Sequence, residues 1–295
     1  RGPYSKAVKT GRVMVNIIHS PLSWEYSSPG HPEAPFRVKN SYQYLKEKGC
    51  SVFEPPPALE EDILLAHSSG LLEKIKEGKF YEPDTPALPG IFQYALLSCG
   101  GAILAMEKAK QGETSFSLMR PPGHHATRAT PGGFCYFNNI AVAVKKGLET
   151  EGKIVILDID CHHGNGTEDI FLGNENVLYV SLHQSPLYPG TGLHSHENAL
   201  NFPLSPGTGE REYLKRLEKA LKEAEQFGPE ILAVSAGFDT YKGDPLTNIE
   251  LEKESYLKIG KMISGLKVRR FALLEGGYSR DLPECIYQFL EGFFL

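Results

Sequence analysis

The stretch KIVILDIDCHHGNG at residues 153–166 decides the fold class of this chain. Its first half is an aliphatic run of the kind that forms a buried strand, and its second half places two aspartates and two histidines where that strand ends. Burying charges without partners costs several kcal/mol, so this cluster indicates a site that holds something positive. A continuous apolar strand also favours a parallel sheet, whose strands are covered on both faces.

The same pattern recurs along the chain, because short apolar runs alternate with longer stretches of helical periodicity. We therefore expect an α/β fold with a mostly parallel central sheet flanked by helices, as one domain over residues 1–295. The clearest helix is 209–228, where apolar residues recur every three or four positions between charged ones. The expected strands are 12–18, 114–119, 153–159, 176–182, 230–236 and 270–274, and the expected helices are 31–49, 90–112, 138–150, 209–228 and 251–266.

The composition argues against several classes of protein. A net charge of −5 lacks the basic face that a nucleic-acid backbone demands, so we expect no nucleic-acid binding. The five cysteines are odd in number and form no CxxC pair, which favours reduced thiols in the cytoplasm. No apolar run approaches the roughly 18 residues that span a bilayer, and the start of the chain lacks the apolar region of a signal peptide. The composition does not predict the oligomeric state.

Polar residues with glycine follow four of the expected strands. RPPGHH follows the strand at 114–119, DCHHGNG follows 153–159, GFDTYKGD follows 230–236 and EGGYSRD follows 270–274. In open α/β sheets, ligands bind outside the carboxyl ends of the strands. We therefore expect these four loops to meet at one site, although they are far apart in the sequence.

Three side chains of the central stretch have the spacing of metal ligands. Asp158, Asp160 and His162 alternate with other residues, so all three can point to one face of an extended segment. Carboxylates and imidazoles are zinc ligands, and Asp239 could add a further carboxylate. The two aspartates taken alone are equally typical of turns or helix caps. The conjunction of four polar strand ends favours a metal site.

The remaining loops offer the groups that hydrolysis at such a metal would need. His124 and His125 can each accept or donate a proton near neutral pH, and Asp158 and Asn165 are the available partners to orient them. Tyr278 carries a hydroxyl beside two glycines and is suited to stabilise a developing oxyanion. Together these residues predict metal-assisted hydrolysis of a carbonyl compound.

These motifs resemble the zinc-dependent histone deacetylase superfamily, which includes acetylpolyamine amidohydrolases and acetoin-utilisation proteins. The resemblance covers most of the chain and implies an arginase-like α/β fold. It also implies an enzyme that removes acetyl groups from acetyl-lysine or acetylpolyamines. The motifs occur in the order of the family: HPEAPFR (31–37), RPPGHH (120–125), GGFCYFNN (132–139), LDIDCHHGNG (157–166), VSLH (180–183), YPGTG (188–192), SAGFDTYKGDPL (235–246) and LEGGY (274–278).

The resemblance also implies a role for each matching residue. One zinc would be bound by Asp160, His162 and Asp239. His125 would act as general base or as base and acid, His124 as its electrostatic partner and possible acid, and Tyr278 would polarise the amide carbonyl. The partner of His124 would be Asp158, and that of His125 would be Asn165, which looks like the class II side of the family and should leave His125 less basic than a carboxylate would.

The substrate tunnel and a second cation follow from the same resemblance. Phe134 and Tyr188 would wall the tunnel, with Gly133 and Gly277 also at the substrate. Asp84 would anchor the substrate at the rim, and Arg37 would lie near an acetate-release channel. Potassium would bind beside the zinc through Asp158, Asp160, His162, Ser181 and Leu182.

Two alternatives and several gaps stay open. A binuclear arginase-like hydrolase would need more bridging carboxylates, and a silent acetyl-lysine binding module would not need both histidines and Tyr278. The sequence after YPGTG is compact, LHSHENALNFPL, which predicts a shorter and more open rim. His194 and His196 within it are expected to be solvated, and no role follows for His163.

Overall fold

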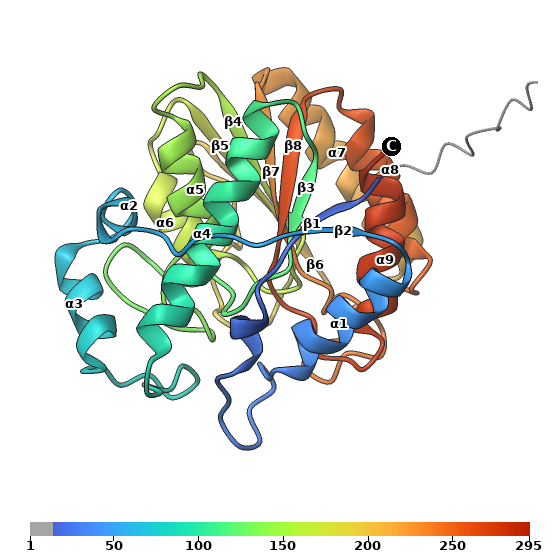
Figure 1. Ribbon diagram of the computed structural model, residues 1–295. Coiled ribbons are helices and arrows are strands. Elements are labelled where there is room, and N and C mark those ends of the chain that lie inside the picture. Colours follow the sequence, from blue (N-terminus) through green and yellow to red (C-terminus); the bar gives the residue numbers. More distant parts are fainter. Residues whose placement is uncertain (1–13) are drawn as a thin grey trace, which may run out of the picture.

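Eight parallel strands form one sheet at the centre of the computed structural model, which describes residues 14–295 (Figure 1). Their order across the sheet is β2-β1-β3-β8-β7-β4-β5-β6. The expectation of an α/β fold with a parallel central sheet is thus confirmed. The strands are β1 (Asn16–Ile18), β2 (Ser51–Phe53), β3 (Ser115–Ser117), β4 (Ile154–Asp158), β5 (Val177–Gln184), β6 (Ala199–Leu204), β7 (Ile231–Ala236) and β8 (Arg269–Leu274).

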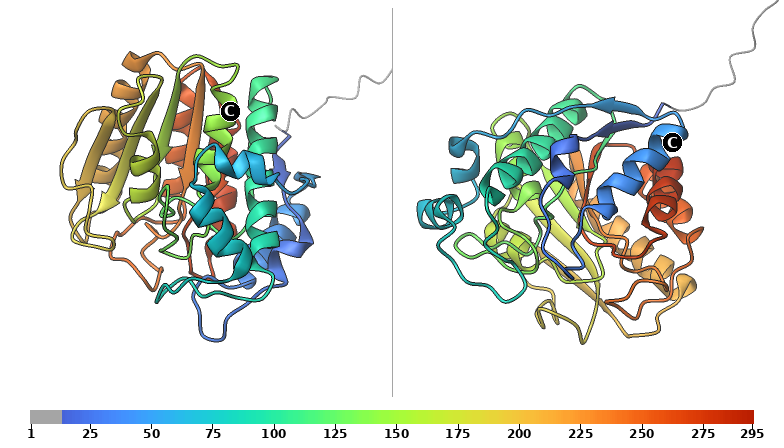
Figure 2. Two further views of the ribbon diagram at one scale, coloured as in Figure 1. Left: turned by 90° about the vertical axis from the view of Figure 1, so that its left-hand side faces the viewer. Right: turned by 60° about the horizontal axis from the view of Figure 1, so that its bottom comes forward.

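Helices cover both faces of the sheet (Figure 2). Alternate residues of β4 explain why, since Val155 and Leu157 belong to one apolar core and Ile154 and Ile156 to the other. Helices α1, α7, α8 and α9 pack on the first core, whereas α3, α4, α5 and α6 pack on the second. The helices are η1 (Pro21–Trp24), α1 (Phe36–Glu47), α2 (Glu60–Leu64), α3 (Ser69–Glu77), α4 (Ile91–Lys110), α5 (Asn139–Gly147), α6 (Asn165–Phe171), α7 (Glu210–Phe227), α8 (Ser255–Gly265) and α9 (Leu282–Phe293).

Every expected strand and helix has a counterpart, but several elements were not expected. Residues 12–13 of the first expected strand lie outside the described residues. β2 and β6 form the two edges of the sheet, where one neighbour is enough and even Pro203 is tolerated. α9 was not expected although its buried residues recur at helical spacing. The expected helix 31–49 begins only at Phe36, which leaves His31 and Glu33 in a loop near the site described below.

Candidate active site

Four neighbouring strands bring the expected site residues to one edge of the sheet. β3, β8, β7 and β4 are adjacent in that order, and all run parallel. Their carboxyl ends lead into the segments that carry His124 and His125, Tyr278, Asp239, and Asp160 with His162. The loops predicted to meet do therefore come together, because parallel strands place their carboxyl ends at the same edge.

Asp160, His162 and Asp239 form the one group of possible metal ligands found among residues 14–295, with ligand atoms within 4.8 Å of one another. His162 Nδ1 lies 3.1 Å from Asp160 Oδ1 and 2.8 Å from Asp239 Oδ2. Burial and the charge of Asp160 raise the pKa of Asp239 to about 7, because a single imidazole faces two buried carboxylates. The two carboxylates carry more negative charge than the one imidazole can balance. Carboxylates and imidazoles are zinc ligands, so the group fits a zinc ion.

Each of the adjacent histidines has a hydrogen-bond partner on the β4–α6 segment. His124 Nδ1 donates to Asp158 Oδ2 at 3.0 Å, and His125 Nδ1 donates to Asn165 Oδ1 at 2.8 Å. An amide oxygen can only accept, so the proton of neutral His125 resides on Nδ1 and leaves Nε2 with a free lone pair. The two pairs implied by the family resemblance are both present.

The surroundings move the pKa values of these two histidines in opposite directions. Burial and the positive charges of His124 and His162 lower the pKa of His125, which keeps this ring neutral. Burial also disfavours the charged form of His124, but Asp158 and Asp160 outweigh it and raise the pKa of His124 to about 10. The protein thus holds one neutral and one cationic imidazole with ring centroids 4.1 Å apart.

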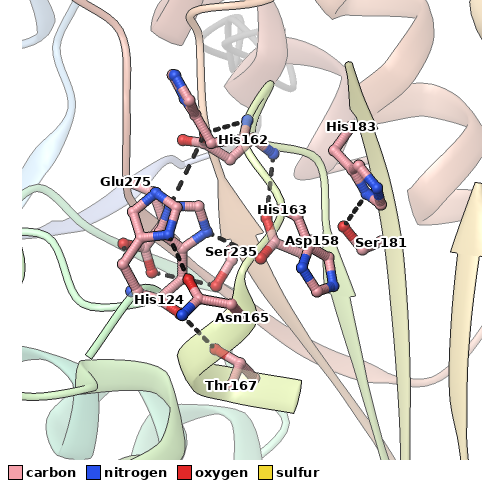
Figure 3. Close-up of polar contacts among 12 residues, drawn as sticks. His124, Asp158, His162, His163, Asn165, Thr167, Ser181, His183, Ser235 and Glu275 are labelled. Atoms are coloured by element: carbon pink, nitrogen blue, oxygen red, sulfur yellow. Dashed lines mark hydrogen bonds and ion pairs between the residues drawn. The ribbon is translucent and has the colours of Figure 1, made fainter. Parts of the chain in front are cut away.

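Glu275, at the end of β8, is a site residue that sequence reasoning missed (Figure 3). Its buried carboxylate accepts from the backbone N–H of Gly123 at 2.7 Å and of His124 at 3.2 Å, and from Ser235 Oγ at 3.1 Å. Burial raises its pKa to about 7. The LEGGY motif could have indicated this role, because a glutamate directly after a buried strand is a buried charge that needs partners, as Asp158 is.

Tyr278 is held from three sides. Its backbone N–H donates to Asp244 Oδ2 at 2.7 Å, and its ring lies 4.7 Å from the guanidinium carbon of Arg37 and 5.7 Å from the ring of Phe134. Arg37 donates to the carbonyl oxygens of Glu275 and Gly277 on the same loop, the latter at 2.7 Å. Burial raises the pKa of Tyr278, so the hydroxyl stays protonated and can donate a hydrogen bond.

Two aromatic side chains lie next to His125 and Tyr278, and their role as tunnel walls stays a prediction. The Tyr188 ring lies 5.1 Å from His125. Phe134 has a φ of 70°, a strained value for a residue with a side chain, and its N–H donates to Thr85 Oγ1 at 2.9 Å. Asp84 Oδ1 accepts from Gly133 N at 3.0 Å, so Asp84 supports the backbone next to Phe134. Its place at the rim stays a prediction.

Glycines are required where the loops approach one another most closely. A Cβ on Gly133, which has φ of 57°, would lie 2.3 Å from His125 Cδ2. Gly277 has φ of 113°, and its Cβ would meet Leu282 at 2.8 Å. A side chain at Gly133 would thus collide with His125, and one at Gly277 with Leu282. Their place beside the substrate stays a prediction.

The expected potassium ligands are close in space. Asp158 pairs in register with Ser181 on the neighbouring strand β5, and Leu182 follows it. All three side chains are buried, and Ser181 Oγ lies 2.9 Å from His183 Nδ1 (Figure 3). Potassium binding at these residues stays a prediction.

A buried cluster around Glu33 holds the side chain of Arg37 in place. This cluster was not anticipated from the sequence. Glu33 accepts from Arg37 Nη1 at 3.0 Å, from Arg120 Nε and Nη2 at 2.6 and 2.7 Å, and from Tyr26 OH at 3.0 Å. Burial alone would raise the pKa of Glu33, but the charge of Arg120, its hydrogen bonds and Arg37 lower the pKa to about 2.

Glu33→Gln is expected to reduce the free energy of unfolding at pH 7 by on the order of 3 kcal/mol, because two buried guanidinium groups lose their counter-charge. The folded pKa lies below the unfolded value near ~4.3, so this stabilisation is present above about pH 4 and is lost as the pH falls toward 2. Urea unfolding between pH 7 and 3 should show the difference between variant and wild type shrinking. Glu175→Gln, at an exposed position, is the control, and a difference that stays constant with pH would contradict the assignment.

No helix among residues 14–295 has the length and apolar character needed to cross a membrane.

Comparisons with known proteins show the family of the chain. Residues 31–293 match the protein family described as Histone deacetylase domain. The probable deacetylase of Archaeoglobus fulgidus is 36% identical over 292 residues, covering 89% of this chain and 80% of that protein. The probable deacetylase of Methanothermobacter thermautotrophicus is 40% identical over 289 residues, covering 92% and 86%. Acetylpolyamine amidohydrolase 2 of Pseudomonas aeruginosa is 35% identical over 212 residues, covering 68% and 61%.

Two solved structures have the same fold. The HDA15 HD domain aligns with a TM-score of 0.88 at 28% identity, covering 94% of this chain and 90% of that one. An acetylpolyamine aminohydrolase from Burkholderia pseudomallei aligns with a TM-score of 0.84 at 26% identity, covering 95% and 98%.

Proposed function

Because the chain belongs to the histone deacetylase family, we propose that it is a zinc-dependent amidohydrolase that removes acetyl or other short acyl groups from N-acylated amines. One structural observation supports this proposal in addition to the family match. The three possible metal ligands, the two partnered histidines and Tyr278 lie together at the carboxyl ends of adjacent strands.

The metal would be held by Asp160, His162 and Asp239. A bound zinc would polarise the amide carbonyl and acidify a water molecule. Gly276 N and Cys161 N donate to the two aspartates at 2.7 and 2.8 Å, which orients both carboxylates toward the imidazole.

His125 would act as the general base. Its Nδ1–H is committed to Asn165, and its lowered pKa leaves Nε2 unprotonated and able to take a proton from water. His124 has a raised pKa and two nearby carboxylates, so it would remain cationic and supply positive charge beside the reacting amide. A proton for the leaving amine would then come from one of these two rings.

Tyr278 would donate its hydroxyl proton in a hydrogen bond to the developing oxyanion. Arg37 fixes the loop around Tyr278 by binding the carbonyl oxygens of Glu275 and Gly277. Phe134 and Tyr188 would line an alkyl chain, and Asp84 would meet polar groups of the substrate at the rim. Potassium at Asp158, Asp160, His162, Ser181 and Leu182 and an acetate path near Arg37 complete the proposed site.

The substrate is an acylated amine, and both acetyl-lysine in proteins and acetylpolyamines are candidates. The solved relatives include one protein named for acetylpolyamines, and each of these amides would present a neutral group on an alkyl chain to the aromatic walls. The scattered cysteines support a reducing compartment, so we place the chain in the cytoplasm.

The test compares kcat/KM for an acetyl-lysine peptide, acetylspermidine and a longer acyl-lysine peptide, with metal content measured on the same sample. Release of acetate by protein that carries a single zinc would support the proposal. Absence of turnover on every substrate would favour a silent binding module, and two metals per chain with hydrolysis of a guanidino group would favour the arginase-like alternative.

A further inference from the structure

The loop at residues 188–194 carries one wall of the proposed substrate site and has little burial of its own. Tyr188 and Leu193 are 46% and 53% exposed, and Thr191 is also exposed. Yet the Tyr188 ring lies 5.1 Å from His125 and 6.5 Å from His162. Something other than apolar packing has to hold this loop in place.

His163, for which the sequence offered no role, makes that connection. It is 1% exposed, its Nδ1 lies 2.8 Å from Thr191 Oγ1, and its Nε2 lies 3.1 Å from Glu168 Oε2. A carboxylate can only accept, so Nε2 carries a proton and donates to Glu168, and in the neutral ring Nδ1 then accepts from the Thr191 hydroxyl. The hydrogen bonds thus run in one direction from the loop through His163 to α6.

Glu168 receives a second connection from the same loop. Asn201 Nδ2 on β6 donates to Glu168 Oε2 at 2.8 Å and lies 3.2 Å from the carbonyl oxygen of His194. Glu168 is therefore linked by hydrogen bonds to Thr191 through His163 and to His194 through Asn201. We call Glu168 with His163 and Asn201 the hub. Since α6 also carries Asn165, the partner of His125, the hub joins the rim to the helix that orients the proposed base.

The packing at Gly192 shows how closely the loop lies on these imidazoles. Its φ is 73°, and a Cβ there would lie 2.5 Å from His163 Cδ2 and 2.7 Å from His183 Cε1. His183 Nε2 donates to the Gly192 carbonyl oxygen at 3.0 Å. A residue without a side chain is needed at this contact.

We propose that Glu168, His163 and Thr191 are positioning residues that hold the loop at 188–194, and thereby set the Tyr188 wall against the substrate. This inference rests on the proposed function for its effect on the substrate, but not for its effect on the loop. The hydrogen bonds act through Tyr188, so they should govern substrate binding more than the chemical step.

The test uses Thr191→Val, which removes the hydroxyl donor at nearly constant volume. We expect backbone amides in 188–194 to exchange hydrogen faster, and KM for the best acylated amine to rise about three- to tenfold, because a buried imidazole nitrogen loses its partner. kcat should change less than about twofold and zinc content not at all, since the Thr191 hydroxyl bonds to His163 and not to a proposed metal ligand. Thr191→Ser should restore wild-type values in both measurements.

Thr150→Val is the matched control, because Thr150 is exposed and lies between α5 and β4, at the amino ends of the strands and away from the site. Glu168→Ala should raise KM further than Thr191→Val, and adding Thr191→Val to it should change little, because both act through one chain of hydrogen bonds. Equal exchange and equal KM in Thr191→Val and Thr150→Val would overturn the proposal. If the wild type hydrolyses no acylated amine, the proposed function fails, whereas the exchange experiment still decides whether the hub holds the loop.

Discussion

Tyr278→Phe is expected to lower kcat by about 10²- to 10³-fold, in line with the loss of one oxyanion donor. The raised pKa of Tyr278 keeps its hydroxyl protonated, and the loop around it is fixed by Arg37 and Asp244 through backbone contacts that phenylalanine would keep. KM and bound zinc should therefore change little. Steady-state kinetics on an acetyl-lysine peptide or acetylpolyamine, with metal analysis, measure both.

Tyr287→Phe is the control for this variant, because Tyr287 also carries a hydroxyl that donates to a neighbour, Glu291, but lies on α9 at the surface. It should behave as wild type. If Tyr278→Phe kept normal kcat, Tyr278 would not be the oxyanion donor. If it lost zinc as well as activity, the effect would be structural.

Removal of the metal is the second large effect. Chelation should lower kcat/KM by on the order of 10³-fold or more, since metal polarisation contributes several kcal/mol to such reactions. Added zinc should restore the activity. Asp239→Ala should bind zinc weakly even when zinc is supplied, because two ligands remain and the buried charge that attracts the cation is reduced.

Asp169→Asn is the control for Asp239→Ala, because Asp169 is an exposed carboxylate on α6 that accepts a hydrogen bond from the backbone N–H of Arg128 and is not among the possible metal ligands. It should keep a full complement of zinc. Full activity after exhaustive chelation, with no metal detected, would exclude the proposed mechanism.

Much of the fold could be predicted because it depends on local patterns. The apolar run that forms β4 is buried on both faces, and this alone required helices on both sides of the sheet. The edge strands β2 and β6 could not be predicted in the same way. They are short or carry polar residues and proline, and only a neighbouring strand makes them strands.

The same distinction applies to the site. Alternation along an extended segment was enough to group Asp160 with His162, and the position of other loops after strands was enough to add Asp239 and the histidines. Glu275 and Glu33 were missed because their importance depends on which distant groups they meet. Glu275 accepts from a loop 152 residues away, and Glu33 from Arg120, 87 residues away.

The sequence by itself determined the parallel α/β class, the strand ends that carry the site and the kinds of ligand in it, because these follow from periodicity and from residue type at adjacent positions. Only the tertiary structure decided which carboxylate accepts from which backbone N–H, and which residues His163 contacts. Two hydrogen bonds, one between Thr191 and His163 and one between His163 and Glu168, join segments that no sequence pattern connects. Burial raises the free-energy cost of losing such a hydrogen bond, and whether a polar side chain is buried depends on the packing of the whole molecule.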